Sequence, residues 1–185
     1  MPSAGRITVL GDSLAVSPSP RDSFPSVLEK RLRGSGLAWT VANAGVRGET
    51  TCGGLRRLDV VLADRPDILI IALGANDGLR GLDVTTMSNN LEAMIVRAIS
   101  RKIRVLLCGM DLPAVRGFGY ARAYRQAFAD LAATHDLPFV PYLLAGVAMD
   151  PAMNGDDAIH PNAAGANQIA STIWPVLENQ VRQVR

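Results

Sequence analysis

The stretch DILIIAL at residues 67–73 places six apolar residues in succession after Asp67. A strand with one exposed face alternates apolar and polar residues, whereas a continuous apolar run is typical of a strand buried on both faces of a parallel sheet. Four other short runs rich in Val, Ile and Leu are also predicted as strands: RITVL (6–10), WTVAN (39–43), IRVLLCG (103–109) and PFVPY (138–142). The sequence therefore predicts a sheet of five strands.

The segments between these strands carry apolar residues at helical spacing, and we expect those residues to pack in the core. The pattern is clearest in 86–101, at Leu91, Met94, Ile95, Ala98 and Ile99. Further helices are predicted over 23–34, over 54–64, over 119–134, and from Pro161 to near the carboxyl end, where Pro175 should break or kink the helix. Strands that alternate with helices indicate a doubly wound α/β fold, with a mostly parallel sheet between two helical layers.

Length and composition indicate one folded domain that spans residues 1–185. With 48% hydrophobic and 19% charged residues, the chain can bury a substantial core. The net charge is +2 and the basic clusters are not interleaved with aromatic residues, which argues against a nucleic-acid partner. We expect a small-molecule substrate instead.

The apolar segments and the cysteines of the sequence bear on where the protein is located and on whether it contains disulfides. No apolar stretch approaches the ~20 residues that cross a bilayer. The first residues run into the first strand without an apolar signal segment, which favours a cytoplasmic protein, although a mature periplasmic or secreted form without its signal peptide would look the same. The two cysteines, Cys52 and Cys108, do not make a disulfide framework, and neither has a histidine nearby in sequence to activate a catalytic thiol.

Polar residues gather directly after the predicted strands, at the edge where ligands bind in such sheets. Gly11-Asp12-Ser13 follows the first strand, NAGVRGETT (43–51) the second, and GANDG (74–78) the third. GDDAIHPN (155–162) follows the fifth strand after a long loop. We expect these four segments to meet at one rim.

A serine with an acid–imidazole pair suits acyl transfer, because a hydroxyl is a poor nucleophile until a base takes its proton. Asp157 lies three residues before His160 and can fix the imidazole tautomer, which makes Ser13, His160 and Asp157 the candidate catalytic residues. A capping aspartate before the last helix explains Asp157 equally well. A metal site is disfavoured, since no further ligand lies at suitable spacing. The other histidine, His135, is expected on the surface at the opposite edge.

An oxyanion needs hydrogen-bond donors aimed at it, and backbone N–H groups near glycines and asparagine amides are common donors. The candidates are the N–H groups of Ser13 and Gly48 and the side chain of Asn76. Two simpler explanations stay open: Gly48 permits a turn with positive φ, and Asn76-Asp77-Gly78 forms a turn. The Gly-x-Ser-x-Gly elbow of the α/β-hydrolases is absent, because Ala15 stands at its second glycine position.

Four blocks in this order resemble the GDSL or SGNH hydrolases: GDSL (11–14), the glycine block after the second strand, GAND (74–77) and DAIHP (157–161). The resemblance covers residues 7 to 175, and it is strongest to the small bacterial thioesterase I, lysophospholipase and arylesterase subgroup. It implies a flavodoxin-like SGNH hydrolase fold.

The resemblance assigns the nucleophile to Ser13, oxyanion donors to Gly48 and Asn76, the orienting acid to Asp157 and the base to His160. Ala75 stands where close relatives often have glycine, which leaves Asn76 in place. The implied activity is that of a serine esterase acting in two steps on short- to medium-chain esters, including aryl esters, thioesters or lysophospholipids. A carbohydrate acetylesterase and a non-catalytic binding module are the alternatives.

No cofactor or metal follows from this chemistry, and because free imidazole titrates near pH ~6.5, activity should rise from acid toward neutral pH. Apolar side chains in the loops of the same rim are candidates to bind the acyl group, although each could merely pack its loop. They are Leu79, Leu82, Leu112, Val115, Phe118, Met149 and Met153.

Overall fold

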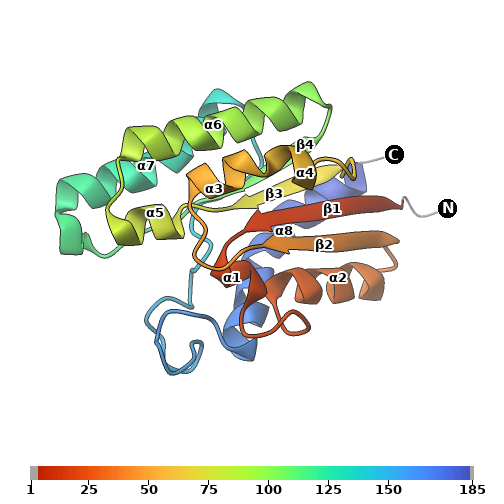
Figure 1. Cartoon of the computed structure of the whole chain (residues 1–185). Helices are drawn as coiled ribbons and strands as arrows, with labels where there is room; N and C mark the ends of the chain where they lie inside the picture. Colours follow the sequence, from red (N-terminus) through yellow and green to blue (C-terminus); the bar gives the residue numbers. More distant parts are fainter. Residues whose placement is uncertain (1–3, 184–185) are drawn as a thin grey trace.

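The computed structural model describes residues 4–183 and contains one five-stranded parallel sheet (Figure 1). The strands follow the order β2-β1-β3-β4-β5. Their bounds are β1 Gly5–Gly11, β2 Trp39–Gly45, β3 Ile68–Ala72, β4 Arg104–Cys108 and β5 Phe139–Val140. Gly11 lies opposite both Gly45 and Ala72. Three strands therefore end at the same level.

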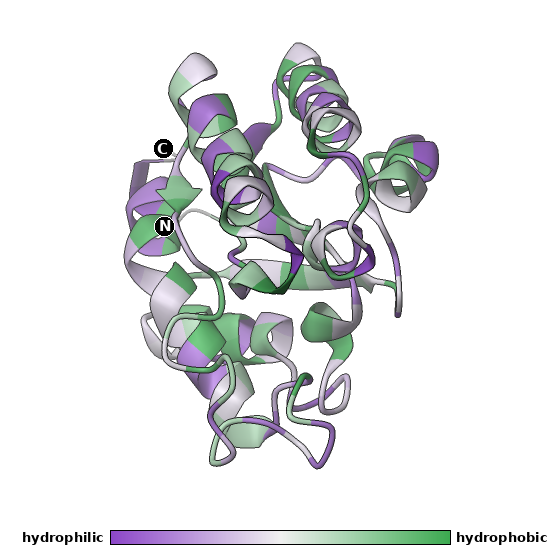
Figure 2. Cartoon of the chain, turned by 90° about the vertical axis from the view of Figure 1, so that its left-hand side faces the viewer, coloured by the Kyte–Doolittle hydropathy of each residue, from purple (hydrophilic) through white to green (hydrophobic). Residues whose placement is uncertain are grey.

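Helices cover both faces of the sheet, as Figures 1 and 2 show, which confirms the predicted three-layer α/β fold. On one face lie α3 (Thr51–Arg56), α4 (Leu58–Val61), α6 (Val84–Ser100) and α7 (Phe118–Thr134). On the other lie α2 (Phe24–Gly34) and α8 (Ala163–Gln183). The short helices α1 (Ser13–Val16), α5 (Ala75–Arg80) and η1 (Ala114–Arg116) follow the ends of β1, β3 and β4.

The core lies between the sheet and these two layers. All five residues of β3 are buried, as its continuous apolar run predicts, because helices cover both sides of this central strand. Trp39, Phe24 and Phe128 are among the largest fully buried side chains. None of the helices within residues 4–183 combines the length and the apolar character that crossing a bilayer requires.

One helix prediction was wrong in detail, and of the break or kink predicted at Pro175 the break was wrong. The helix predicted over 54–64 is two short helices that meet at Arg57, whose φ of −101° and ψ of 5° interrupt the regular geometry. The helix after Pro161 does not break at Pro175 but continues to Gln183. Its stripe of buried side chains, which includes Ile173 and Leu177, stays packed on both sides of the proline, so tertiary burial outweighs the local penalty.

Two smaller differences occur at the edges of the core. Ile99, predicted to be buried, is 44% exposed in the last turn of α6, although the adjacent Ala98 is buried. The strand predicted over 138–142 is only two residues long, because Pro138 and Pro141 flank it and have no N–H group to donate.

Candidate active site

Ser13 is the first residue of α1, directly beyond the end of β1. Asp12 is the N-cap of this helix, and its Oδ1 accepts the Leu14 N–H at 2.9 Å. An ideal Cβ on Gly11 would lie 2.8 Å from the Ala15 Cβ, so the close turn from strand to helix requires glycine here. This turn places the Ser13 hydroxyl at the carboxyl edge of the sheet.

His160 reaches Ser13 from the long loop between β5 and α8 (Figure 1). Its Nε2 lies 2.9 Å from the Ser13 Oγ, and its Nδ1 lies 2.5 Å from Oδ2 of Asp157. With Nδ1–H donating to the carboxylate, Nε2 is free to accept the serine proton. The structure therefore joins three side chains that the sequence separates by up to 147 positions.

The Asp157 carboxylate is oriented by its own loop. Its Oδ1 accepts the backbone N–H groups of Ile159 and His160 at 3.0 and 2.9 Å. The imidazole of His160, followed by these N–H groups, lowers the pKa of Asp157 below its usual value. Asp157 is not the cap of α8, because Asn162 Oδ1 accepts the Gly165 N–H at 3.0 Å in the first turn of that helix. The capping alternative for Asp157 is therefore wrong.

The loop that carries His160 is held in shape by hydrogen bonds within residues 147–162. Gly155 N–H donates to the His160 carbonyl, and Asn162 N–H donates to the Met153 carbonyl, each at 2.9 Å. The buried Asn154 side chain donates to the carbonyls of Val147 and Asp150 at 2.6 and 2.8 Å. These bonds fix the position from which the imidazole reaches the hydroxyl.

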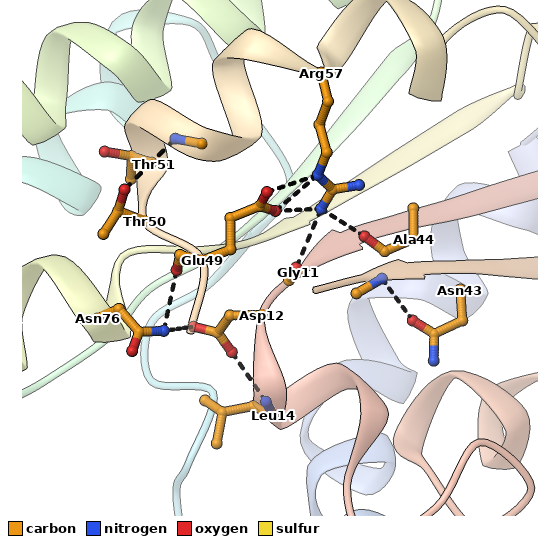
Figure 3. Close-up of polar contacts among 12 residues, drawn as sticks. Gly11, Asp12, Leu14, Asn43, Ala44, Glu49, Thr50, Thr51, Arg57 and Asn76 are labelled. Carbon is orange, nitrogen blue, oxygen red and sulfur yellow. Dashed lines mark hydrogen bonds and ion pairs between the residues drawn. The ribbon is translucent and has the colours of Figure 1, made fainter. Parts of the chain in front are cut away.

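The three candidate oxyanion donors lie beyond the aligned ends of β1, β2 and β3. Gly48 has a φ of +71°, so it does form a turn with positive φ, and this does not prevent its N–H from acting as a donor. Asn76 lies in the first turn of α5, so the alternative explanation that residues 76–78 form a simple turn is wrong. Its Nδ2 donates to the Glu49 carbonyl at 3.0 Å and to Asp12 Oδ2 at 3.2 Å (Figure 3).

Three residues around the site were not proposed as functional from the sequence. Asp12 is fully buried, and burial raises the pKa of its carboxyl from 3.8 to about 6. Glu49 and Arg57 form an ion pair beside the loop of Gly48 (Figure 3). Asp12 stands in the GDSL block and Glu49 in the glycine block, but Arg57 gave no sequence signal, because it lies within a predicted helix.

A cavity of about 470 Å³ opens beside Ser13 and His160. Of the seven residues predicted to bind the acyl group, Leu79, Leu112 and Met149 line it. The other lining residues are Asp12, Leu14, Ala75, Asn76, Met110, Asp111, Pro113, Tyr142, Leu144, Ala148, Ala158 and Ile159. Its wall is therefore mostly apolar.

The remaining four predicted residues, Leu82, Val115, Phe118 and Met153, do not line this cavity. Val115 and Phe118 are 87% and 86% exposed, since η1 and the start of α7 turn them toward solvent. Leu82 is also exposed, and Met153 packs against the core. Which way a loop side chain points depends on the path of the loop, and the sequence pattern does not contain that path.

A larger depression of about 830 Å³ lies at the opposite edge of the sheet, lined by residues of segments 62–67 and 101–104. No serine or histidine is among its lining residues, so we place the chemistry at the Ser13 cavity. His135 ends α7, and its Nε2 lies 3.3 Å from Glu92 Oε1. Within residues 4–183, no three His, Cys, Asp or Glu side chains gather so as to hold a metal ion.

The two cysteines take no part in the site. Cys108 is buried in β4, and burial raises the pKa of its thiol, while Cys52 is exposed on α3. The apolar surroundings of Cys108 keep its thiol protonated and unreactive.

Comparison with known proteins gives consistent matches over almost the whole chain. The model of the GDSL-like lipase/acylhydrolase family matches residues 9–168. Esterase TesA of Pseudomonas aeruginosa is 35% identical over 178 residues, which are 95% of this chain and 89% of that protein. Thioesterase 1/protease 1/lysophospholipase L1 of Escherichia coli is 31% identical over 162 residues, covering 86% of this chain and 76% of that protein.

Among solved structures, the psychrotrophic esterase EstA from Pseudoalteromonas sp., in a form inhibited by monoethylphosphonate, matches with a TM-score of 0.90 and 25% identity. The match covers 97% of this chain and 100% of the EstA chain.

Proposed function

This chain belongs to the GDSL-like lipase/acylhydrolase family and is an ester-hydrolysing enzyme, and we propose that it works through an acyl-enzyme formed on Ser13. One observation carries this proposal. The Ser13 Oγ, both ring nitrogens of His160 and the Asp157 carboxylate form a continuous relay, with separations of 2.9 and 2.5 Å. Such a relay activates a hydroxyl at neutral pH.

In the first step the Ser13 Oγ attacks the ester carbonyl while His160 Nε2 takes its proton. Asp157 keeps Nδ1 protonated and stabilises the imidazolium that forms. The lowered pKa of Asp157 keeps that carboxylate ionised across the neutral range. His160 then gives the proton to the departing alcohol oxygen as the carbonyl re-forms.

The negative oxygen of the tetrahedral intermediate is met by the N–H groups of Ser13 and Gly48 and by the Asn76 amide. In the free protein both N–H bonds of that amide are used, by Asp12 and by the Glu49 carbonyl. An oxyanion in this position takes one of them from its present acceptor. In the second step water attacks the acyl-enzyme, again with His160 as the base, and releases the acid.

The shape and the lining of the cavity support short- to medium-chain acyl groups, with aryl esters, thioesters and lysophospholipids as the ester classes. Its apolar walls suit an aliphatic chain, whereas a carbohydrate acetylesterase would need more groups to bind sugar hydroxyls. The name of the Escherichia coli relative supports acyl thioesters and lysophospholipids as classes to test.

The proposal is tested by replacing the nucleophile. Ser13→Ala should lower kcat for p-nitrophenyl butyrate by about 10⁴-fold or more, because without the hydroxyl no acyl-enzyme forms. Ser26→Ala is the matched control, because Ser26 is half-buried on α2 and its hydroxyl donates only to the Arg21 carbonyl at 2.8 Å, and this variant should keep full activity. A phosphonate ester should add its mass to the wild-type protein at Ser13 and leave Ser13→Ala unlabelled. Normal turnover by Ser13→Ala would show that the nucleophile is assigned wrongly.

A further inference from the structure

The ion pair between Glu49 and Arg57 is sheltered, unlike the surface pairs of this protein. The Glu49 side chain is 8% exposed and that of Arg57 24%. Arg57 Nε lies 2.8 Å from each oxygen of the Glu49 carboxylate, and Arg57 Nη2 also donates to Oε2. A forked contact of this kind fixes both side chains in one geometry.

Arg57 also holds the ends of two strands. Its Nη2 donates to the carbonyl of Ala44 at 2.6 Å and approaches that of Gly11 at 3.4 Å (Figure 3). Gly11 ends β1 directly before the GDSL turn, and Ala44 lies at the end of β2 before the loop that contains Gly48. One guanidinium group therefore contacts both segments that lead to oxyanion donors.

We call the ion pair of Glu49 and Arg57, with the contacts of Arg57 to the two strand ends, the brace. Glu49 connects the brace to the oxyanion donors Gly48 and Asn76. It follows Gly48 directly, and its N–H donates to the Val46 carbonyl at 3.2 Å, which closes the turn around Gly48. Its own carbonyl accepts the Asn76 amide at 3.0 Å. A shift of Glu49 would thus move the Gly48 N–H and release the Asn76 side chain together.

We propose that Arg57 and Glu49 are positioning residues that aim the oxyanion donors Gly48 and Asn76. The inference rests on the proposed function of this site. Neither side chain is among the residues that line the cavity, so both act through the loop and not by touching the substrate. The brace then contributes to transition-state binding and leaves ground-state binding largely unchanged.

The test uses Arg57→Lys, which keeps the charge but replaces the planar fork with a single ammonium group that cannot hold Glu49 and the strand carbonyls at once. We expect kcat for p-nitrophenyl butyrate to fall by about ten- to a hundredfold, less than the ~10²–10³ of losing a whole donor, with KM nearly unchanged. Glu49→Gln keeps the shape of the side chain and removes its charge, and it should also lower kcat. This variant replaces Arg57→Lys in the test if Arg57→Lys does not fold.

Arg182→Lys is the matched control, since Arg182 also pairs with one carboxylate through Nε and Nη2. Both nitrogens donate to Glu178 Oε1, at 3.1 and 2.7 Å, on the exposed face of α8. This variant should keep wild-type kcat. Thermal unfolding of every variant shows whether any loss follows from a smaller folded fraction.

Measuring the effect of Arg57→Lys again in the Asn76→Ala background separates a positioning role from a general effect on stability. If the brace acts through the donors, the loss caused by Arg57→Lys should shrink clearly when Asn76 is already gone. Wild-type kcat in Arg57→Lys, or an equal loss in both backgrounds, would overturn the inference. Ser13→Ala distinguishes failure of this inference from failure of the proposed function. If Ser13→Ala is inactive and Arg57→Lys is fully active, the acyl-enzyme mechanism stands and only the positioning role is wrong.

Discussion

The carboxylate of Asp12 lies wholly inside the protein, between the Leu14 N–H and the Asn76 amide. Burial raises its pKa from 3.8 to about 6 against the opposing effect of these two hydrogen bonds. The folded state therefore holds a proton that the unfolded chain releases between these pH values. The unfolding free energy should fall as pH rises from about 4 to about 6, by about 3 kcal/mol from this group, and stay level above.

Denaturant titrations at pH 4 and pH 7 check this, because the Asp12→Asn variant lacks the titrating group and should not show that part of the decrease. Asp83→Asn is a control that should leave the difference between pH 4 and pH 7 nearly unchanged, because the lowered pKa of Asp83 confines its effect to more acid pH. The backbone and hydroxyl of Thr86 lower the pKa of Asp83, so its contribution to stability is present above the usual carboxyl pKa and lost in acid. An identical pH dependence in wild type and Asp12→Asn would contradict the assignment.

At the scale of elements, the first turn of α8 packs directly on the loop that carries Asp157 and His160. An ideal Cβ on Gly165 would lie 2.1 Å from the Met153 carbonyl oxygen and 3.0 Å from the Pro161 Cβ. Gly165→Ala must therefore push loop and helix apart, at a cost of about 1–3 kcal/mol in unfolding free energy. It should also lower kcat, because the same loop aims His160 at Ser13.

Thermal unfolding and ester hydrolysis measure both effects. Gly119→Ala is the matched control: Gly119 also lies in a helix, but apart from its chain neighbours and the backbone of its own helix no atom comes within 4 Å of its ideal Cβ. Alanine there should leave activity unchanged and keep or raise stability. Wild-type activity and stability in Gly165→Ala would show that the loop has room to move without losing the relay.

At the scale of the whole molecule, segments that follow four different strands enclose the cavity, and Ser13 and Leu14 come from the one after β1. Leu79 comes from α5, Leu112 from the segment after β4, and Leu144 from the loop after β5. Each acyl CH₂ buried there is worth about 0.8 kcal/mol, or about a fourfold gain in kcat/KM, until the space of about 470 Å³ is filled. We expect kcat/KM to rise from p-nitrophenyl acetate to medium chains and then to fall.

A series of p-nitrophenyl esters from acetate to palmitate measures this profile. Leu144→Ala should move the optimum to longer chains by enlarging the cavity, whereas Val115→Ala, outside the lining and 87% exposed, should leave it in place. A steady rise to palmitate in the wild type would contradict an acyl site limited to the space of about 470 Å³.

The fold and the family could be predicted because their signals are local in the sequence. The apolar run at 67–73 and the helical stripe at 86–101 identify their elements from neighbouring residues alone, and the parallel sheet and the resemblance from the four blocks are both confirmed. The sequence also presented Ser13, Asp157 and His160 in the right order. It could not show whether Asp157 caps a helix or faces an imidazole, because both need the same short spacing.

By itself, then, the sequence determined the strands, the layers, the family and the candidate chemical groups, since burial and motif patterns depend on residues close along the chain. Only the tertiary structure decided that His160 Nε2 lies 2.9 Å from the Ser13 Oγ, that Arg57 contacts the carbonyls of Gly11 and Ala44, and that Val115 and Phe118 face solvent. Those outcomes depend on strand order and on the paths of loops, which bring together groups up to 147 residues apart. Helix α8 also depended on tertiary packing, because only its buried stripe shows why it continues through Pro175.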